Sequence, residues 1–158
     1  MKSILSHTLL LAATCAFLNS CGNSSVPAAS LTANEQSLLN ALNAKRARDG
    51  KQPLQASADL TELARKDAAR RVAEGSDYKD NRSATGYEKL VTLSGKGRPG
   101  QTFGYTLMSA WTQIPQQEQW ISGNYANAGV GTAPGADGLE TGVLLLGGYS
   151  ANSSLLGF

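Results

Sequence analysis

Apolar side chains recur at helical spacing in two neighbouring stretches of the chain. In the first stretch, Leu38, Leu39 and Leu42 lie on one face of a helix that ends near Arg48, before Gly50. A second apolar stripe follows after a short extended link and also ends at a glycine. Its residues are Leu60, Leu63, Ala64, Ala68 and Val72, and the glycine is Gly75. The pattern therefore predicts two amphipathic helices.

The residues at the starts of both helices are of the types that cap helices. Thr32 and Glu35 match a capping box, in which the Thr hydroxyl accepts a backbone N–H and the Glu carboxylate reaches back to the cap residue. Ser57 or Asp59 is predicted to cap the second helix, with Glu62 placed to complete a similar box with Asp59. We interpret the basic residues of the second helix as its solvated face. They are Arg65, Lys66, Arg70 and Arg71.

The second half of the chain predicts one helix and three short strands. The predicted segments are a strand at 89–93, a helix at 102–113, and two strands at 128–133 and 139–146 joined by a turn at 134–138. The glycine-rich stretch 95–100 is predicted to lack regular structure, and Pro115 to open a short turn that carries Trp120 and Ile121. Helices first and a hairpin last are typical of an α+β domain, with helices packed on a small antiparallel sheet.

The first twenty residues have the pattern of a bacterial secretion signal. Lys2 precedes an apolar run at residues 4–18, which is too short to span a membrane as a helix. The run ends at residues 18–21, where an aliphatic residue, two tolerated residues and Cys21 resemble a lipobox, the motif whose cysteine is lipidated. An ordinary signal peptide with an incidental cysteine is the alternative interpretation.

The lipobox interpretation predicts a membrane-anchored protein of the bacterial cell envelope. Residues 1–20 would be cleaved, and acyl chains on Cys21 would bind a membrane on its periplasmic or its outer, extracellular face. Residues 21–31 would form a flexible tether, residues 32–149 the domain and residues 150–158 a short tail.

Composition narrows the chemistry that is open to the mature protein. His7, the only histidine, and Cys15 lie within the predicted signal, and Cys21 would be blocked by lipid. We therefore expect no imidazole base, thiol nucleophile, disulfide or Cys/His zinc site, and no cofactor. The net charge of +2 does not indicate a basic surface that would bind nucleic acid, so nucleic acid is not expected as a partner. The oligomeric state is left open.

A set of spaced residues resembles the CAP superfamily, the group of cysteine-rich secretory proteins, antigen 5 and plant pathogenesis-related 1 proteins, also called the SCP domain. The matching residues are Leu39, Asn40, Asn43, Arg46, Gly50, Pro53 and Leu54 in the first helix and link, Ala58, Asp59, Leu60, Ala64 and Ala68 in the second helix, and Trp111, Pro115, Tyr125, Gly129, Val130, Gly131 and residues 142–147 further on. The resemblance covers most of residues 35–149. It implies a three-layer α-β-α sandwich, in agreement with the order of elements above.

The chain departs from this family at a cleft where relatives often hold a divalent metal with two histidines and acidic residues. The first histidine position falls at Asp77 or Tyr78, and the second at Gln117. The Glu-Asn pair of the bacterial pattern falls at Thr92 and Leu93. The resemblance therefore implies a scaffold without the metal site, and a candidate ligand-binding cleft lined by Tyr78, Thr92 and Gln117.

Other short patterns offer weaker chemistry. Ser76 and Lys79 match the S-x-x-K spacing of penicillin-interacting serine enzymes, without the other motifs of those enzymes. Residues 95–102 resemble a phosphate-binding loop without its lysine, so an anion site with Lys96 and Arg98 at a helix start is a further possibility. Carboxylates for a glycosidase-like pair are also present. They are Asp77, Asp80, Glu88, Glu118 and Glu140.

Three functions follow from these observations. We favour a non-catalytic ligand-binding or interaction module for a lipid or cell-wall component, in which Trp111 and Trp120 belong to the core and do not line a ligand groove. The alternative is an envelope hydrolase that acts on peptidoglycan or peptide through carboxylates such as Asp77 and Glu118, or through Ser76 with its lysine. A third possibility is a structural or adhesion protein without a pocket.

Overall fold

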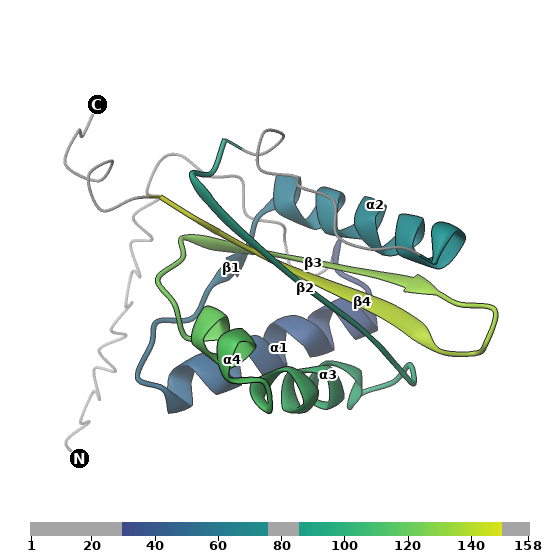
Figure 1. Cartoon of the computed structure of the whole chain (residues 1–158), viewed down its shortest axis with the longest axis horizontal. Coiled ribbons are helices and arrows are strands. Elements are labelled where there is room, and N and C mark those ends of the chain that lie inside the picture. The colour runs from purple at the N-terminus through teal and green to yellow at the C-terminus, as the bar shows by residue number, and fades with distance from the viewer. Residues whose placement is uncertain (1–29, 76–85, 150–158) are drawn as a thin grey trace, which may run out of the picture.

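The computed structural model describes residues 30–75 and 86–149, which form four helices and four strands (Figure 1). In chain order the elements are α1 (Ala33–Arg48), β1 (Gln55–Ala56), α2 (Ala58–Glu74), β2 (Lys89–Gly97), α3 (Phe103–Thr112), α4 (Pro115–Ile121), β3 (Asn127–Pro134) and β4 (Glu140–Gly148). The predicted signal peptide, most of the predicted tether and the tail lie outside the described residues.

The strands form one sheet in the order β1-β3-β4-β2. The predicted hairpin of β3 and β4 is confirmed, and β2 pairs with β4 along its whole length, from Lys89 opposite Gly148 to Gly97 opposite Glu140. These three strands are antiparallel. The two-residue strand β1 pairs with β3 in parallel and makes the sheet mixed.

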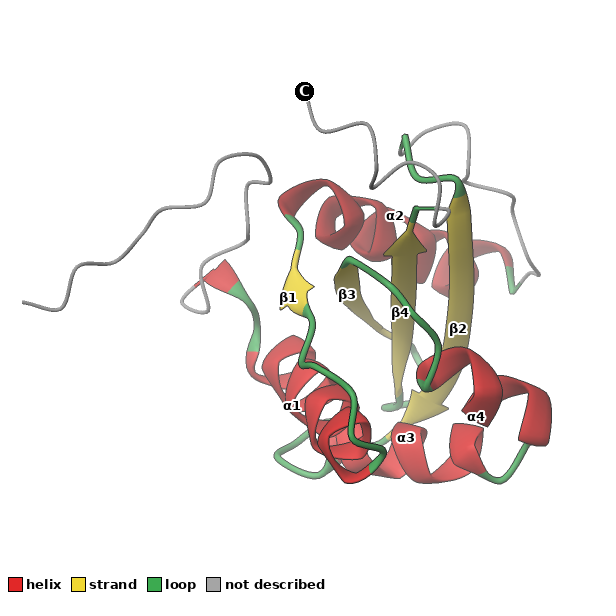
Figure 2. Ribbon diagram, turned by 90° about the vertical axis from the view of Figure 1, so that its left-hand side faces the viewer, coloured by secondary structure: helices red, strands yellow, loops and turns green. Residues whose placement is uncertain are grey.

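The helices lie in two layers, one on each face of the sheet (Figure 2). α2 covers one face, while α1, α3 and α4 cover the other. Each layer has its own core: Leu60, Ala64 and Leu145 are buried beneath α2, and Leu38 and Phe103 are buried in the larger core on the opposite face. The predicted α+β, α-β-α sandwich is therefore confirmed.

Two glycines let α2 lie directly on β3. A Cβ atom at Gly129 would stand 2.3 Å from the backbone of Leu60, and one at Gly131 would stand 2.2 Å from the backbone of Ala64. The predicted apolar stripe of this helix is the face that meets the strand, because Leu60, Ala64 and Ala68 are fully buried. The helix packs here by backbone contact, which any larger residue on β3 would prevent.

The predicted helix ends are largely confirmed. Thr32 Oγ1 accepts the N–H of Glu35 at 3.2 Å, and Glu35 Oε2 accepts the N–H of Thr32 at 2.8 Å. Gly75 ends α2 in the left-handed conformation, with φ of 66°. Ser57 occupies the cap position of α2 without a side-chain capping bond, and Asp59 lies inside the first turn, so the box predicted with Asp59 is wrong.

Two predictions for the second half of the chain are wrong. β2 continues through Gly95 to Gly97, because these glycines lie under α3, where a Cβ at Gly95 would stand 3.0 Å from Leu107. Pro115 begins the helix α4 and does not open a turn, since proline suits the first position of a helix. Ile121, at the end of α4, is fully buried in the larger core.

The interpretation of the basic residues of α2 as a solvated face holds for Lys66 alone, whose side chain is 71% exposed. Arg65 donates to Glu35 across the edge of the sheet, with nitrogen–oxygen distances of 2.6 and 2.7 Å. Arg70 and Arg71 both donate to Asp67, which is buried. Three of the four basic residues therefore hold buried carboxylates in place.

Candidate functional site

The structure separates two residues that were predicted to line one cleft. Thr92 lies in β2, and Gln117 lies in the first turn of α4. Alternate residues of β2 face opposite layers: Leu90 packs under α2, and Leu93 packs in the core of α1 and α3. Thr92 shares the face of Leu90, whereas α4 belongs to the other layer (Figure 2). The two residues therefore do not meet.

The other predicted site residues, Tyr78 and Cys21, lie outside the described residues. Of the two that are described, Thr92 is half-buried and pairs with Leu145 of β4. The side-chain oxygen of Gln117 is buried and has no hydrogen-bond partner within residues 30–75 and 86–149.

The face of β2 that carries Thr92 also lines a groove at the end of α2. The groove has a volume of about 230 Å³ and lies between the last turn of α2 and the strands β2 and β4. It is lined by Arg71, Val72, Gly75, Ser94, Gly95, Lys96 and Thr141. Thr92 itself is not among these lining residues, and the sequence analysis did not predict a groove at this place.

Two cations line this groove, and each contacts a carboxylate. Arg71 Nε donates to Asp67 at 2.9 Å, and Asp67, which is only 4% exposed, also accepts a bond from Arg70 at 2.5 Å. Lys96 Nζ lies 3.3 Å from Asp137, and both side chains are about half exposed. A nearby backbone N–H and, after it, Lys96 lower the pKa of Asp137. Arg71 is thus fixed in position, whereas Lys96 can turn toward a ligand.

Two hydroxyl groups complete the polar lining. Thr141 is 4% exposed, and its Oγ1 has no hydrogen-bond partner among the described residues. A buried hydroxyl without a partner costs about 1–3 kcal/mol, which a bound polar group would offset. Ser94 is the second hydroxyl, and its carbonyl accepts the indole N–H of Trp111 at 3.1 Å. The groove therefore offers a guanidinium, an ammonium and two hydroxyls to an anionic, hydroxyl-bearing group.

The groups proposed for hydrolysis are not assembled in the described part of the chain. Glu118 pairs with Lys45 at 3.1 Å, and Glu140 accepts a hydrogen bond from Asn34. Ser76, Asp77, Lys79 and Asp80 lie outside the described residues.

Two backbone N–H groups at the start of α3 already donate to side chains of α1, so they are not available to the anion site predicted there. The N–H of Gly100 donates to the side chain of Asn34 at 2.9 Å, and that of Gly104 donates to Ser37 Oγ at 3.0 Å. Lys96 instead lines the groove beside α2. Trp111, at the other end of this helix, is buried in the core as predicted.

The described residues also do not fit the divalent metal that clefts of the CAP superfamily often hold. Within residues 30–75 and 86–149, no three side chains of His, Cys, Asp or Glu gather closely enough to hold a metal ion. The equivalents of two ligand positions, Thr92 and Gln117, are a hydroxyl and an amide on different layers of the fold.

Two residues of the groove, Arg71 and Thr141, were missed from the sequence. Alternation along the last strand could have identified Thr141, because it shares one face of β4 with Val143 and Leu145. Which of these residues border a groove depends on where α2 ends above this face. The position of α2 depends in turn on its close packing against Gly129 and Gly131.

The fold and the groove define an α-β-α sandwich domain with a polar groove on its single-helix face. Comparison with known families identifies it: the model of the cysteine-rich secretory protein family (CAP) matches residues 39–146. The chain therefore belongs to the CAP family.

A solved structure supports the same fold. An outer surface protein from Borrelia burgdorferi superimposes with a TM-score of 0.61 at 12% sequence identity, over 82% of this chain and 100% of that protein. At this identity the likeness concerns the fold alone. No curated protein matches the sequence of this chain.

Proposed function

We propose that the chain is a non-catalytic binding domain of the bacterial cell envelope, anchored through lipid on Cys21. Its groove at the end of α2 binds an anionic, hydroxyl-bearing component of the cell wall. The observation that carries the proposal is the buried hydroxyl of Thr141, which has no hydrogen-bond partner among the described residues and lies in a groove that also holds Arg71 and Lys96.

The lining of the groove favours recognition over catalysis. The charged groups that line the groove are cations, and each of them contacts a nearby carboxylate, Asp67 or Asp137. The hydroxyls of Ser94 and Thr141 have no base beside them among the lining residues. Such groups donate hydrogen bonds to phosphate, carboxylate or sugar oxygens. Hydrolysis of peptidoglycan is the alternative, and no arrangement among the described residues favours it.

Envelope location is supported by the secretion-like pattern of the first twenty residues and by the lipobox-like residues 18–21. The solved structure with the same fold is itself named as an outer surface protein. Every helix in residues 30–75 and 86–149 is too short or too polar to cross a bilayer. In this proposal, acyl chains on Cys21 supply the attachment to the membrane, on the periplasmic or the outer face.

Co-sedimentation with insoluble cell wall tests the binding function. The full chain, in mild detergent, is mixed with purified cell wall and, in a second arm, with vesicles of anionic phospholipid. We expect the parent chain to sediment with cell wall, and the variants Lys96→Ala and Thr141→Val to do so several-fold less. Lys66→Ala removes an exposed cation of α2 outside the groove and is the matched control.

Three results would overturn this assignment. Binding to vesicles and not to cell wall, with a loss in Lys96→Ala and Thr141→Val, would identify a lipid headgroup as the ligand class, because insertion of the acyl chains alone would not respond to these variants. Equal losses in Lys96→Ala and Lys66→Ala would show attraction by general charge. Release of soluble wall fragments by the parent chain would show that it is a hydrolase.

The lipid anchor has a separate test. Cells that express the full chain are fed a labelled fatty acid, and the chain is isolated from the membrane and soluble fractions. We expect label on the parent chain in the membrane fraction, and an unlabelled, soluble chain for Cys21→Ser. An unlabelled parent chain would support the ordinary signal peptide.

A further inference from the structure

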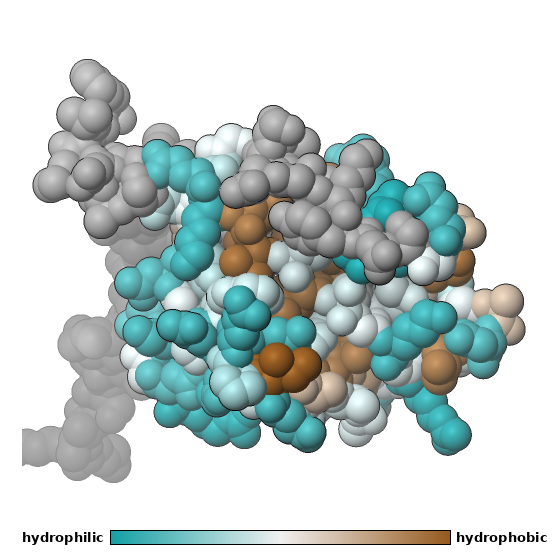
Figure 3. All heavy atoms as spheres, in the orientation of Figure 1, coloured by the Kyte–Doolittle hydropathy of each residue, from teal (hydrophilic) through white to brown (hydrophobic). Residues whose placement is uncertain are grey.

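The helices α3 and α4 carry almost no charge. From residue 101 to residue 135 the only charged residue is Glu118, which pairs with Lys45 of α1. α3 nevertheless faces solvent on one side, and Figure 3 shows a strongly hydrophobic spot at the junction of α3 and α4. Exposed helix faces of soluble proteins are normally charged, so this face calls for an explanation.

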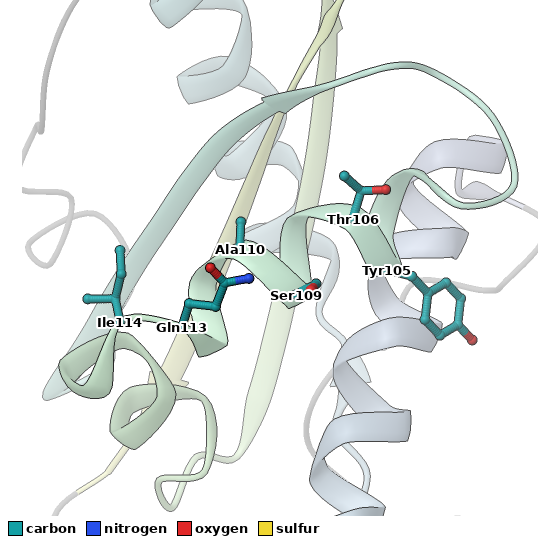
Figure 4. Close-up of a pocket in the computed structure, with 6 residues that line it drawn as sticks. All are labelled: Tyr105, Thr106, Ser109, Ala110, Gln113 and Ile114. Atoms are coloured by element: carbon teal, nitrogen blue, oxygen red, sulfur yellow. The ribbon is translucent and has the colours of Figure 1, made fainter.

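The outer side of α3 forms a shallow hollow of about 780 Å³ (Figure 4). Its lining residues are Tyr105, Thr106, Ser109, Ala110, Gln113 and Ile114. The two large ones, Tyr105 and Ile114, stand at opposite ends and are 50% and 48% exposed. The inner side of the helix is already used, because Phe103, Leu107 and Trp111 are buried in the core.

These six residues are arranged symmetrically about the midpoint between Ser109 and Ala110. Tyr105 and Ile114 are equally distant from it, as are Thr106 and Gln113. The residues form two neighbouring i, i+4 ridges, with small side chains at the centre and large ones at the ends. Two-fold symmetry requires a surface that is complementary to itself, in which residue i meets residue j and j meets i.

We infer that the outer face of α3 binds a second copy of this chain, with the two α3 helices antiparallel. At the crossing angle of about −50° that i, i+4 ridges favour, Tyr105 of each copy lies beside Ile114 of the other. Ser109 and Ala110 lie at the crossing point, where their small side chains let the helices approach closely. Thr106 and Gln113 lie toward each other on either side of that point.

A second copy fits this face better than a charged partner does. No lining residue carries charge, so nothing repels an identical surface and nothing attracts an acidic or basic one. One helix face covers less than the roughly 800 Å² per partner of a standard interface, so the dimer is expected to be weak and dependent on concentration. Covalent trapping is therefore the suitable test.

Cysteine cross-linking tests the crossing point. The full chain with Ser109→Cys or Ala110→Cys is oxidised in membranes or in mild detergent, and covalent dimers are counted on a denaturing gel. Both variants should give at least ten-fold more dimer than Ala69→Cys, which places a cysteine on the exposed side of α2. The parent chain measures any background from Cys21.

Charge reversal tests the antiparallel arrangement. In the Ser109→Cys background, Tyr105→Glu and Ile114→Lys should each reduce dimer several-fold, since each places a charge against an apolar residue. Mixing the two variants should restore dimer, because the glutamate of one copy then meets the lysine of the other. Ala69→Glu is the control and should change nothing. Equal trapping at positions 69 and 109, or no rescue on mixing, would overturn the inference.

Discussion

The helices α2 and α3, which lie on opposite faces of the sheet in this CAP domain, differ in how they use charge. α2 carries Arg65, Arg70 and Arg71, and each of them holds a buried carboxylate. The exposed face of α3 carries no charge at all. α2 is joined to its surroundings by ion pairs and borders a polar groove, whereas α3 presents an uncharged outer face with a shallow hollow. This contrast is the basis of our two proposals, a polar ligand for the groove beside α2 and a second copy of the chain for the outer face of α3.

The layers also differ in how they meet the sheet. α2 touches β3 by backbone contact at Gly129 and Gly131, whereas α3 covers the glycines of β2 and β4 with the side chains of Phe103 and Leu107. A side chain can move aside, but a backbone cannot. The contact of α2 with the sheet should therefore tolerate change less well than the contact of α3, although the core beneath α2 contains fewer large residues.

The largest expected effect is the loss of stability when the contact between α2 and β3 is disrupted. Gly131→Ala places a Cβ 2.2 Å from the backbone of Ala64, so α2 must move off the sheet. We expect a loss of about 3 kcal/mol or more in the free energy of unfolding, measured by urea denaturation. Gly95→Ala is the matched control, because its Cβ comes closest to the end of the Leu107 side chain, at 3.0 Å, and meets Trp111 at an ordinary 3.5 Å. It should cost about 1 kcal/mol or less. Equal losses would contradict the contrast between the layers.

A smaller effect concerns the ion pair between α1 and α2. Glu35 is 1% exposed and Arg65 is 40% exposed. Burial alone would raise the pKa of Glu35, but the hydrogen bonds from Arg65 and Thr32 outweigh it and hold the pKa below its ordinary value. Arg65→Met leaves the carboxylate buried with fewer partners and should cost about 2 kcal/mol at pH 7, less than a fully buried pair because Arg65 is partly in water.

The pH dependence of that loss sharpens the test. Because folding lowers the pKa of Glu35, the stability from its ionised form is complete above the pKa in the unfolded chain, about 4.3, and disappears as the pH falls through the folded value. Urea denaturation at pH 7 and at pH 3 should therefore show the difference between parent and Arg65→Met shrinking in acid. A difference that stays constant would mean that Arg65 acts by packing alone.

The smallest expected effect is on ligand affinity. Thr141→Val keeps the shape of a buried residue of β4 and removes the hydroxyl that lacks a partner among the described residues. We expect the chain to be as stable as the parent or slightly more so, and to bind soluble cell-wall fragments several-fold more weakly, in line with about 0.5–1.5 kcal/mol for one hydrogen bond. Unchanged affinity, measured by calorimetric titration, would remove Thr141 from the site.

Local signals allowed much of the fold to be predicted. The capping pair Thr32 and Glu35, the stripe of α2 and the turn between the last two strands each depend on neighbouring residues, and all are confirmed. The extension of β2 through Gly95 and Gly97 was missed, because glycine disfavours a strand by itself and only the side chains of α3 above these positions make it necessary.

The candidate site was harder to predict than the fold. Alignment with the family gave positions along the chain but not the face on which each residue lies, so Thr92 and Gln117 were assigned to one cleft although the sheet lies between their layers. The basic residues of α2 appeared solvated for a similar reason: their partners Glu35 and Asp67 are buried by elements that the local pattern does not include.

Hydrogen exchange with mass spectrometry would test the groove most directly. The full chain is compared with and without soluble cell-wall fragments, and the protection of backbone amides is mapped along the sequence. Our account predicts new protection at residues 71–75 and 94–96, which border the groove, and unchanged exchange at residues 105–114 of the α3 face. Protection confined to the α3 face, or none in either layer, would contradict the assignment of the groove as the ligand-binding site.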